Sequence, residues 1–136
     1  GAHDPSCLWL CPWALEDNRL ESCCDRLEGE HDFSAFVHKE ERKKKSNTMV
    51  LERFGVEKLS ETQEDAPVVD IKFMLEAKGF ARSMCRNLVG FVVDVCRKTL
   101  DESDIEKVLQ KPDESASIVN SAPASGLCLE KVWMDK

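Results

Sequence analysis

The sequence predicts an α+β fold in which helices cover one face of a mainly antiparallel sheet. Apolar and polar residues alternate over residues 69–77, which is the period of a strand with one buried face. In two other stretches apolar residues recur at intervals of three and four, which is the period of an amphipathic helix. The predicted order of helix, strand, strand, helix, helix, strand is typical of the α+β class.

The first half of the chain predicts one helix and one strand. The helix is indicated by an i, i+3, i+4, i+7 spacing of apolar residues: Leu20, Cys23, Cys24 and Leu27. Acidic residues 16 and 17 suit its first turn, and Gly29 suits its C-terminal end. The lysine- and glutamate-rich residues 38–47 predict a loop. A strand is expected over residues 49–59, with Gly55 as a candidate bulge.

The second half predicts the clearest strand, two helices and a last strand. Residues 61–67 read as a loop before the alternating strand at 69–77. The next helix is expected over residues 81–98, with a broad apolar stripe on one side and Arg86, Gly90 and Asp94 on the other. A capping box formed by Ser103 and Glu106 predicts a second helix that ends before Pro112. A small-residue loop then leads to a strand over residues 127–134.

Three strands make a thin sheet with exposed edges. Such a sheet is expected to extend by pairing with another half, either of the same polypeptide or of a partner. Residues 1–7 are expected to be a remnant or a cut end, the first three without structural weight, and residues 8–136 are expected to form one domain.

The charge distribution allows RNA binding without requiring it. The net charge of −7 argues against a nucleic-acid-binding protein when taken alone. However, residues 78–98 carry five basic residues against Asp94, and residues 39–45 carry five against two acids. A local basic face of this kind can contact phosphates. An exposed, solvated loop is the alternative for the lysine-rich run.

Composition excludes several other classes. Seven cysteines, most of them in apolar patterns, predict free thiols in a reducing intracellular compartment. Zinc fits poorly, because there is no C-x-x-C and Cys7-x-x-x-Cys11 lacks a second ligand pair. The longest apolar stretch, residues 88–93, is too short to span a bilayer. Catalysis by this chain alone has little support, because it contains neither a nucleophile motif nor a glycine-rich phosphate loop.

Arg86 is the most informative single residue. It lies in a strongly apolar helical run within residues 79–90, where an unpaired buried cation would be too costly. It is therefore expected in a surface groove or beside an anion. Gly90, one turn further on, leaves space for a partner, and a carboxylate or phosphate would suit the guanidinium. A solvated helix residue is the alternative on these grounds alone.

Three motifs together resemble the TruA family of tRNA pseudouridine synthases. They are Gly29-Glu30-His31-Asp32-Phe33-Ser34-Ala35-Phe36, Met84-Cys85-Arg86-Asn87-Leu88-Val89-Gly90, and Ala122-Pro123-Ala124-Ser125-Gly126-Leu127. The chain is similar to the C-terminal half of such an enzyme, from about residue 8 to residue 134. The resemblance implies one ferredoxin-like half of the pseudouridine synthase fold, an N-terminal half as partner, and a homodimer.

The resemblance also implies a reaction and its residues. Uridine in the anticodon stem-loop of tRNA would be isomerised to pseudouridine, with no metal or organic cofactor. Arg86 would pair with the catalytic aspartate of the other half, hold it ionised and orient it. Leu127 would contact the base. Phe33 is a candidate for substrate binding, although both phenylalanines of its motif are expected mainly in the core. The residues expected to touch RNA phosphates are Lys43, Lys44, Lys45, Lys78 and Arg82.

Several positions depart from the family pattern. The catalytic aspartate is expected in an Arg-Thr-Asp or Arg-Leu-Asp loop of a preceding half, and this chain contains neither tripeptide and no tyrosine. Arg26-Leu27-Glu28 is the nearest match, but it carries glutamate on a predicted helix and is rejected as a substitute. Residues 46–49 lack a usual arginine, and Cys96-Arg97 replaces a usual glycine. A non-catalytic RNA-binding or assembly protein, and a separately encoded half, are the alternatives.

Overall fold

The computed structural model describes residues 5–8, 17–42, 46–58, 71–81, 83–97, 99–121 and 130–133. Its helices are α1 (Asp17–Leu27), α2 (Lys39–Arg42), α3 (Met84–Cys96), α4 (Ser103–Gln110) and α5 (Pro112–Ser115), with 3-10 turns η1 (Ser34–Phe36) and η2 (Ala116–Ile118). Its strands are β1 (Pro5–Leu8), β2 (Gly29–Asp32), β3 (Thr48–Leu51), β4 (Arg53–Lys58), β5 (Ile71–Glu76) and β6 (Glu130–Trp133).

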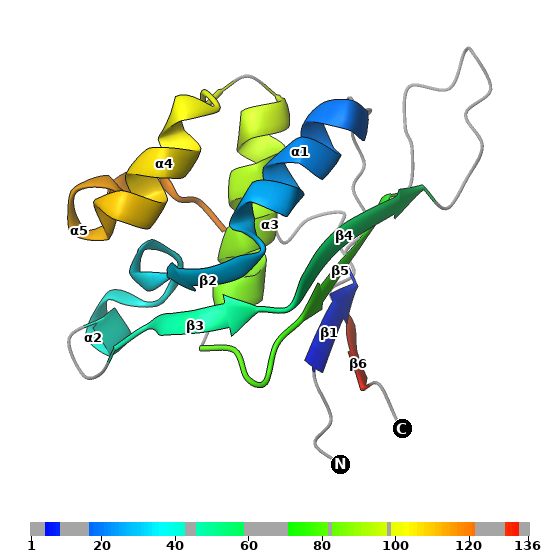
Figure 1. Cartoon of the computed structure of the whole chain (residues 1–136), viewed down its shortest axis with the longest axis horizontal. Helices are drawn as coiled ribbons and strands as arrows, with labels where there is room; N and C mark the ends of the chain where they lie inside the picture. Colours follow the sequence, from blue (N-terminus) through cyan, green and yellow to red (C-terminus); the bar gives the residue numbers. More distant parts are fainter. Residues whose placement is uncertain are drawn as a thin grey trace.

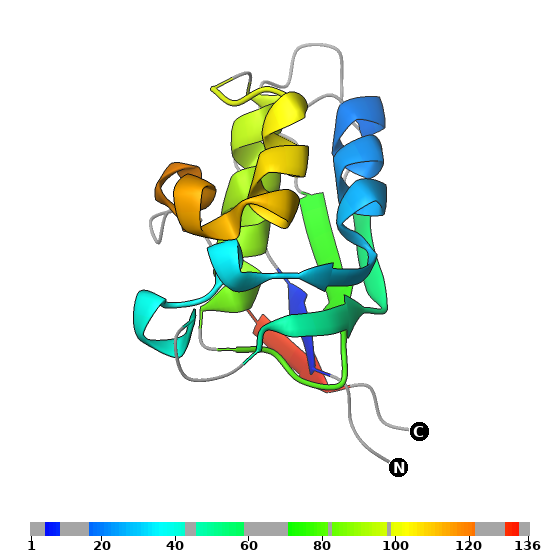
Figure 2. The ribbon, with the colours of Figure 1, turned by 60° about the vertical axis from the view of Figure 1, so that its left-hand side comes forward.

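The described strands form three antiparallel pairs. Strand β1 pairs with β6, β2 with β3, and β4 with β5, where Phe54 lies opposite Leu75. Helices α1, α3 and α4 lie together on one side of these strands (Figures 1 and 2). The predicted α+β class, with a mainly antiparallel sheet, is therefore confirmed. Strand β1 includes Pro5, Ser6 and Cys7, which were expected to lie outside the domain.

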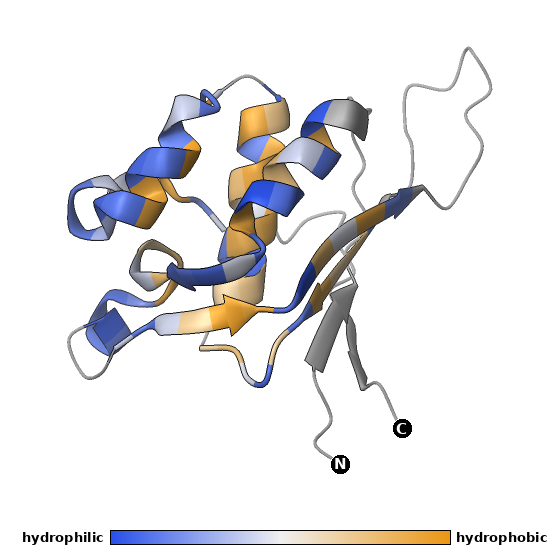
Figure 3. Ribbon diagram, in the orientation of Figure 1, coloured by the Kyte–Doolittle hydropathy of each residue, from blue (hydrophilic) through white to orange (hydrophobic). Residues whose placement is uncertain are grey.

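A single hydrophobic core lies between the helices and the strands. Helix α3 supplies ten buried residues and is apolar along most of its length (Figure 3). The apolar face of α1 and the inward residues Phe73 and Leu75 of β5 meet it, so both predicted periodicities are confirmed. Each fully buried leucine or phenylalanine contributes about 1.5–3 kcal/mol. No helix among the described residues is long and apolar enough to cross a membrane.

Gly29 ends the first helix as predicted, but it also begins a strand. Helix α1 stops at Leu27, and Gly29 has a φ of +99°, which residues with a side chain rarely adopt. The reversed backbone direction sends the chain into β2, whose Glu30 and His31 pair with Val50 and Met49 of β3. Strand β2 was not predicted, because its four residues have no alternating pattern.

The strand predicted over residues 49–59 is two strands. The ladder breaks at Glu52, whose amide donates to the Glu76 carbonyl, and β3 and β4 pair with different partners. Leu51 and Phe54 are both fully buried, yet residues three apart on one strand point to opposite faces. The break lets both side chains enter the core. The predicted bulge at Gly55 is wrong, because Gly55 pairs in regular register with Met74.

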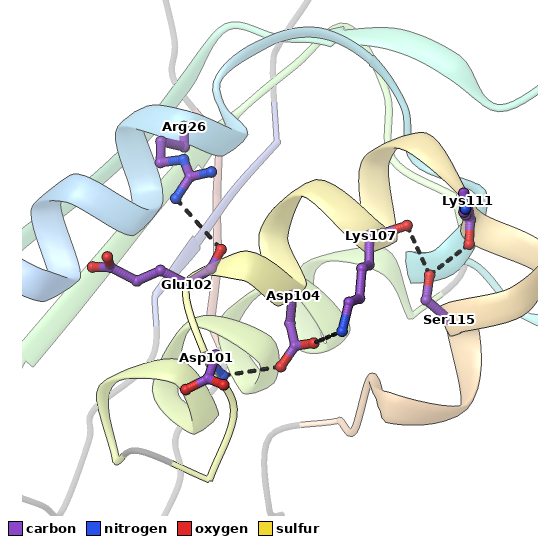
Figure 4. Close-up of polar contacts among 7 residues, drawn as sticks. All are labelled: Arg26, Asp101, Glu102, Asp104, Lys107, Lys111 and Ser115. Atoms are coloured by element: carbon purple, nitrogen blue, oxygen red, sulfur yellow. Dashed lines mark hydrogen bonds and ion pairs between the residues drawn. The ribbon is translucent and has the colours of Figure 1, made fainter.

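Helix α4 begins with a different cap from the one predicted. The Asp101 amide donates to Asp104 Oδ2 at 2.9 Å, and the Asp104 amide donates to the Asp101 carbonyl at 3.0 Å (Figure 4). This reciprocal pair stands two residues earlier than the expected Ser103–Glu106 box, for which the structure shows no side-chain cap bond. The Asp104 carboxylate thus satisfies an amide that precedes the helix, as the acidic residue of a capping box does.

Two predicted loops contain short helices. Helix α2, with no buried residue, lies in the lysine-rich loop, whereas α5 begins at Pro112 and η2 follows it. At the latter site the buried Ser115 donates to the carbonyls of Lys107 and Lys111 at 3.0 and 2.7 Å (Figure 4). Each carbonyl also accepts a backbone amide, from Lys111 and Ser115 respectively, so the hydroxyl adds a second hydrogen bond at the end of α4.

Candidate functional site at the start of helix α3

The turn before helix α3 has a strained backbone. Ser83 precedes Met84 with φ 63° and ψ 2°, which is the left-handed region and unusual for a residue other than glycine. The Met84 amide donates to the Ala81 carbonyl, and the Asn87 amide donates to the Ser83 carbonyl at 3.0 Å. Such conformations cost about 1–3 kcal/mol and often occur at functional sites. Here the turn sets the direction from which α3 and its motif begin.

Arg86 lies at the boundary between core and solvent. It is half-buried, whereas Cys85 before it and Leu88 and Val89 after it are buried. This placement agrees with the expectation that its charge lies at a surface rather than in the core. Gly90, one turn further, is itself buried, so the space that the sequence predicted to be open is already covered.

Asn87 joins the motif of α3 to two distant segments. Its Nδ2 donates to the Phe36 carbonyl at 2.8 Å, at the end of the residue 29–36 motif. Its side-chain oxygen accepts from Ser121 Oγ at 2.5 Å, directly before residues 122–129 in the sequence. One carboxamide therefore uses both its donor and its acceptor to connect segments 51 and 34 residues away.

The motif at residues 29–36 is fixed from within. Asp32 accepts from the Ser34 amide at 3.0 Å and from its hydroxyl, and His31 Nε2 lies 2.8 Å from the Glu28 carbonyl. His31 and Asp32 therefore use different partners and do not act as a pair. Asn47 extends the network, because its Nδ2 donates to Ser34 Oγ and its carbonyl accepts from the Phe33 amide.

A cavity of about 300 Å³ lies between the start of β3 and the connection from β5 to α3. It is lined by Ser46, Asn47, Thr48, Met49, Gly79, Phe80 and Ala81. Hydroxyl, amide and apolar groups therefore face one space beside the strained turn. The exposed Lys78 directly precedes one wall in the sequence. A cavity of this size and mixed lining suits a small polar ligand or part of a larger one.

The comparison with known proteins identifies the family. The sequence profile described as "tRNA pseudouridine synthase" matches residues 23–134. The chain belongs to this family. It is 31% identical over 128 residues to tRNA pseudouridine synthase A of Thermodesulfovibrio yellowstonii, covering 92% of the chain and 49% of the relative. It is 32% identical over 122 residues to the tRNA pseudouridine synthase A of Listeria innocua, covering 89% of the chain and 46% of the relative. The chain spans about half the length of the curated relatives it matches.

The structure places three of the eight predicted site residues of this pseudouridine synthase family member. Arg86 is half-buried on α3, and Lys78 is exposed between β5 and α3. Phe33 is 0% exposed and packs edge-on against His31, with ring centroids 5.6 Å apart. A fully buried ring offers no face to a base, so its substrate-binding role is corrected to core packing. Those outside the described residues are Lys43, Lys44, Lys45, Arg82 and Leu127.

The tripeptide Arg26-Leu27-Glu28 has structural roles. Arg26 Nη2 lies 2.6 Å from Glu106 Oε1 on α4, and Arg26 also donates to the Glu102 carbonyl (Figure 4). Leu27 is fully buried. Glu28 Oε2 accepts the amide proton of Phe54 at 2.7 Å. These contacts agree with its rejection as a substitute for the catalytic tripeptide of the family.

The contacts of Asn87 are the part of this region that the sequence did not predict. Asn87 lies inside the motif at residues 84–90, where only the charge of Arg86 indicated a function. The sequence did contain one indication of these contacts. Asn87 is a neutral amide among buried apolar residues, and an amide in such surroundings needs hydrogen-bond partners.

Proposed function

We propose that the chain forms the C-terminal half of the catalytic cleft of a tRNA pseudouridine synthase. The protein would convert uridine in the tRNA anticodon stem-loop to pseudouridine by releasing the uracil, rotating it and rejoining it through carbon. The observation that carries the proposal is the family match across residues 23–134, with Arg86 of its motif at the solvent boundary of α3. The isomerisation is redox-neutral and needs no metal or organic cofactor.

Arg86 is proposed to orient a catalytic aspartate that an N-terminal half supplies. A half-buried guanidinium interacts with a carboxylate more strongly than one in open water, because the local dielectric is lower. The opposite charge would hold the carboxylate ionised, and the planar fork would fix its direction. The strained turn at Ser83 supports this role, because it sets the start of the helix that carries Arg86.

The residues proposed to contact RNA are next in sequence to those that line the cavity. Lys43, Lys44 and Lys45 precede its wall at Ser46, and Lys78 and Arg82 flank its wall at residues 79–81. Basic residues at these positions would contact phosphates. Leu127 is proposed to pack on the base. A homodimer and a reducing intracellular compartment complete the proposal.

The test compares arginine variants in the natural polypeptide that contains these residues. We expect Arg86→Ala to lower pseudouridine formation in transfer RNA at least a hundred-fold, with little change in the unfolding midpoint. Arg86→Lys should recover only a small part, because lysine cannot pair a carboxylate bidentately. Arg53→Ala is the matched control, since Arg53 pairs with Glu76 between β4 and β5.

Two outcomes would overturn the proposal. Unchanged pseudouridine formation in Arg86→Ala would remove Arg86 from the mechanism. Tight tRNA binding by the wild-type polypeptide without any product would favour a non-catalytic RNA-binding protein.

A further inference from the structure

Helix α3 holds the segment that ends at residue 121 through the side chain of Asn87. The side-chain oxygen of Asn87 accepts a hydrogen bond from the Ser121 hydroxyl at 2.5 Å. Its Nδ2 donates to the Phe36 carbonyl at 2.8 Å. One residue of the helix therefore connects residue 121 with residue 36.

The other bond of Asn87 ends on a segment that is already fixed. The Phe36 ring lies edge-on to Phe91 of α3, with centroids 5.5 Å apart, and is fully buried. The Phe36 carbonyl therefore provides a fixed anchor for Nδ2 of Asn87. This anchor leaves the side-chain oxygen aimed at Ser121, which is exposed and lies outside the core.

We propose that Asn87 is a positioning residue of the pseudouridine synthase reaction, whose carboxamide ties residues 36 and 121 to the turn of α3 that carries Arg86. This inference rests on the proposed function. Asn87 and Arg86 are adjacent on one helix, so the bonds to Phe36 and Ser121 fix the turn that carries the group proposed to orient the aspartate. Displacing one reacting group by about 1 Å can lower a rate about a hundred-fold.

Variants on both sides of the bond test the inference in the natural polypeptide. Asn87→Leu keeps the approximate size but removes both hydrogen bonds, and Ser121→Ala removes one bond from the other side. We expect each to lower kcat about ten- to a hundred-fold, with less than a two-fold change in the KM for tRNA. Ser121→Thr, which keeps the hydroxyl, should restore kcat. Ser117→Ala, an exposed serine in the same segment, is the control.

A double variant separates positioning from general stability. If both residues act through one bond, the effects of Asn87→Leu and Ser121→Ala on kcat will not add. Additive effects, a wild-type kcat in Ser121→Ala, or a loss of activity explained by the unfolded fraction would overturn the inference.

Hydrogen exchange distinguishes failure of the inference from failure of the proposed function. In Asn87→Leu we expect faster amide exchange in peptides covering residues 117–121, and unchanged exchange in β4 and β5. Unchanged exchange at 117–121 would overturn the inference even if the wild-type protein makes no pseudouridine. Faster exchange in a protein whose wild type is inactive would support the positioning by Asn87 and reject only the reaction.

Discussion

Replacing Glu28 should destabilise the protein without a direct effect on chemistry. Its carboxylate accepts the Phe54 amide proton at 2.7 Å, and Phe54 is 1% exposed at the start of β4. Glu28→Ala removes this acceptor and leaves a buried amide without it. A hydrogen bond to a charged group contributes about 1.5–3 kcal/mol, and leaving a buried donor unsatisfied costs a similar amount. We expect a loss of about 1.5–3 kcal/mol, or roughly 5–12 °C in Tm for a chain of this size.

Glu28→Gln is the matched variant for this prediction. Its amide oxygen can still accept from Phe54, and removing a negative charge next to the C-terminus of α1 offsets part of the lost bond strength. Its stability should therefore lie within about 1 kcal/mol of the wild type. Urea unfolding followed by circular dichroism measures both variants, and a constant m-value shows that the same surface is exposed.

Two results would refute the reasoning about Glu28. A wild-type urea midpoint in Glu28→Ala would mean that the Phe54 amide finds another partner. A folded Glu28→Gln protein without turnover would mean that Arg26-Leu27-Glu28 takes part in the chemistry after all.

Three further predictions concern backbone strain, pH and thiol reactivity. Gly29→Ala should cost about 1 kcal/mol in unfolding free energy, because alanine is strained at φ +99° although the nearest atom would lie 3.9 Å from its Cβ. Burial raises the pKa of Asp94 against the opposing effects of Asn120 and Arg97, so its ionisation costs stability as pH rises above 3.8. Asp94→Asn should therefore raise the urea midpoint at pH 7 and lose this advantage near pH 3. Burial raises the pKa of Cys23 to about 12 and that of Cys24 well above its usual value, so alkylation of both at pH 8 should require unfolding, as peptide mapping can check.

The sequence predicted well the elements in which the regular pattern of apolar residues continues over a long stretch. Helix α3 and strand β5 each bury one continuous face, so burial and sequence pattern agree residue by residue. The four residues of β2 have no such pattern, and they form a strand because β3 lies beside them. The break at Glu52 likewise depends on which strand each segment pairs with. Pairing between distant segments is a tertiary effect, so local pattern does not contain it.

In the candidate site, too, some features could be predicted from the sequence and others could not. The position of Arg86 at a solvent boundary followed from its charge, since a buried unpaired cation would be too costly. The role of Asn87 did not follow, because its partners are a backbone carbonyl and a hydroxyl that the sequence places 51 and 34 residues away. Phe33 shows another limit of prediction from sequence. An aromatic residue in a motif can stack on a base or pack in the core, and its burial distinguishes these two roles.

The adjacent positions of Arg86 and Asn87 suggest why one short helical motif can serve a cleft. Neighbouring residues on a helix point about 100° apart, so a single turn can present one side chain to the solvent boundary and the other to the chain's own segments. In α3 the neutral amide binds η1 and residue 121, while the charged guanidinium stays at the boundary. An amide suits the position of Asn87 because it donates and accepts at once, which neither arginine nor aspartate does at neutral pH. Because Asn87 is neutral, helix α3 can bind two segments of its own chain next to the cation Arg86. No second charge is introduced that would need a partner of its own.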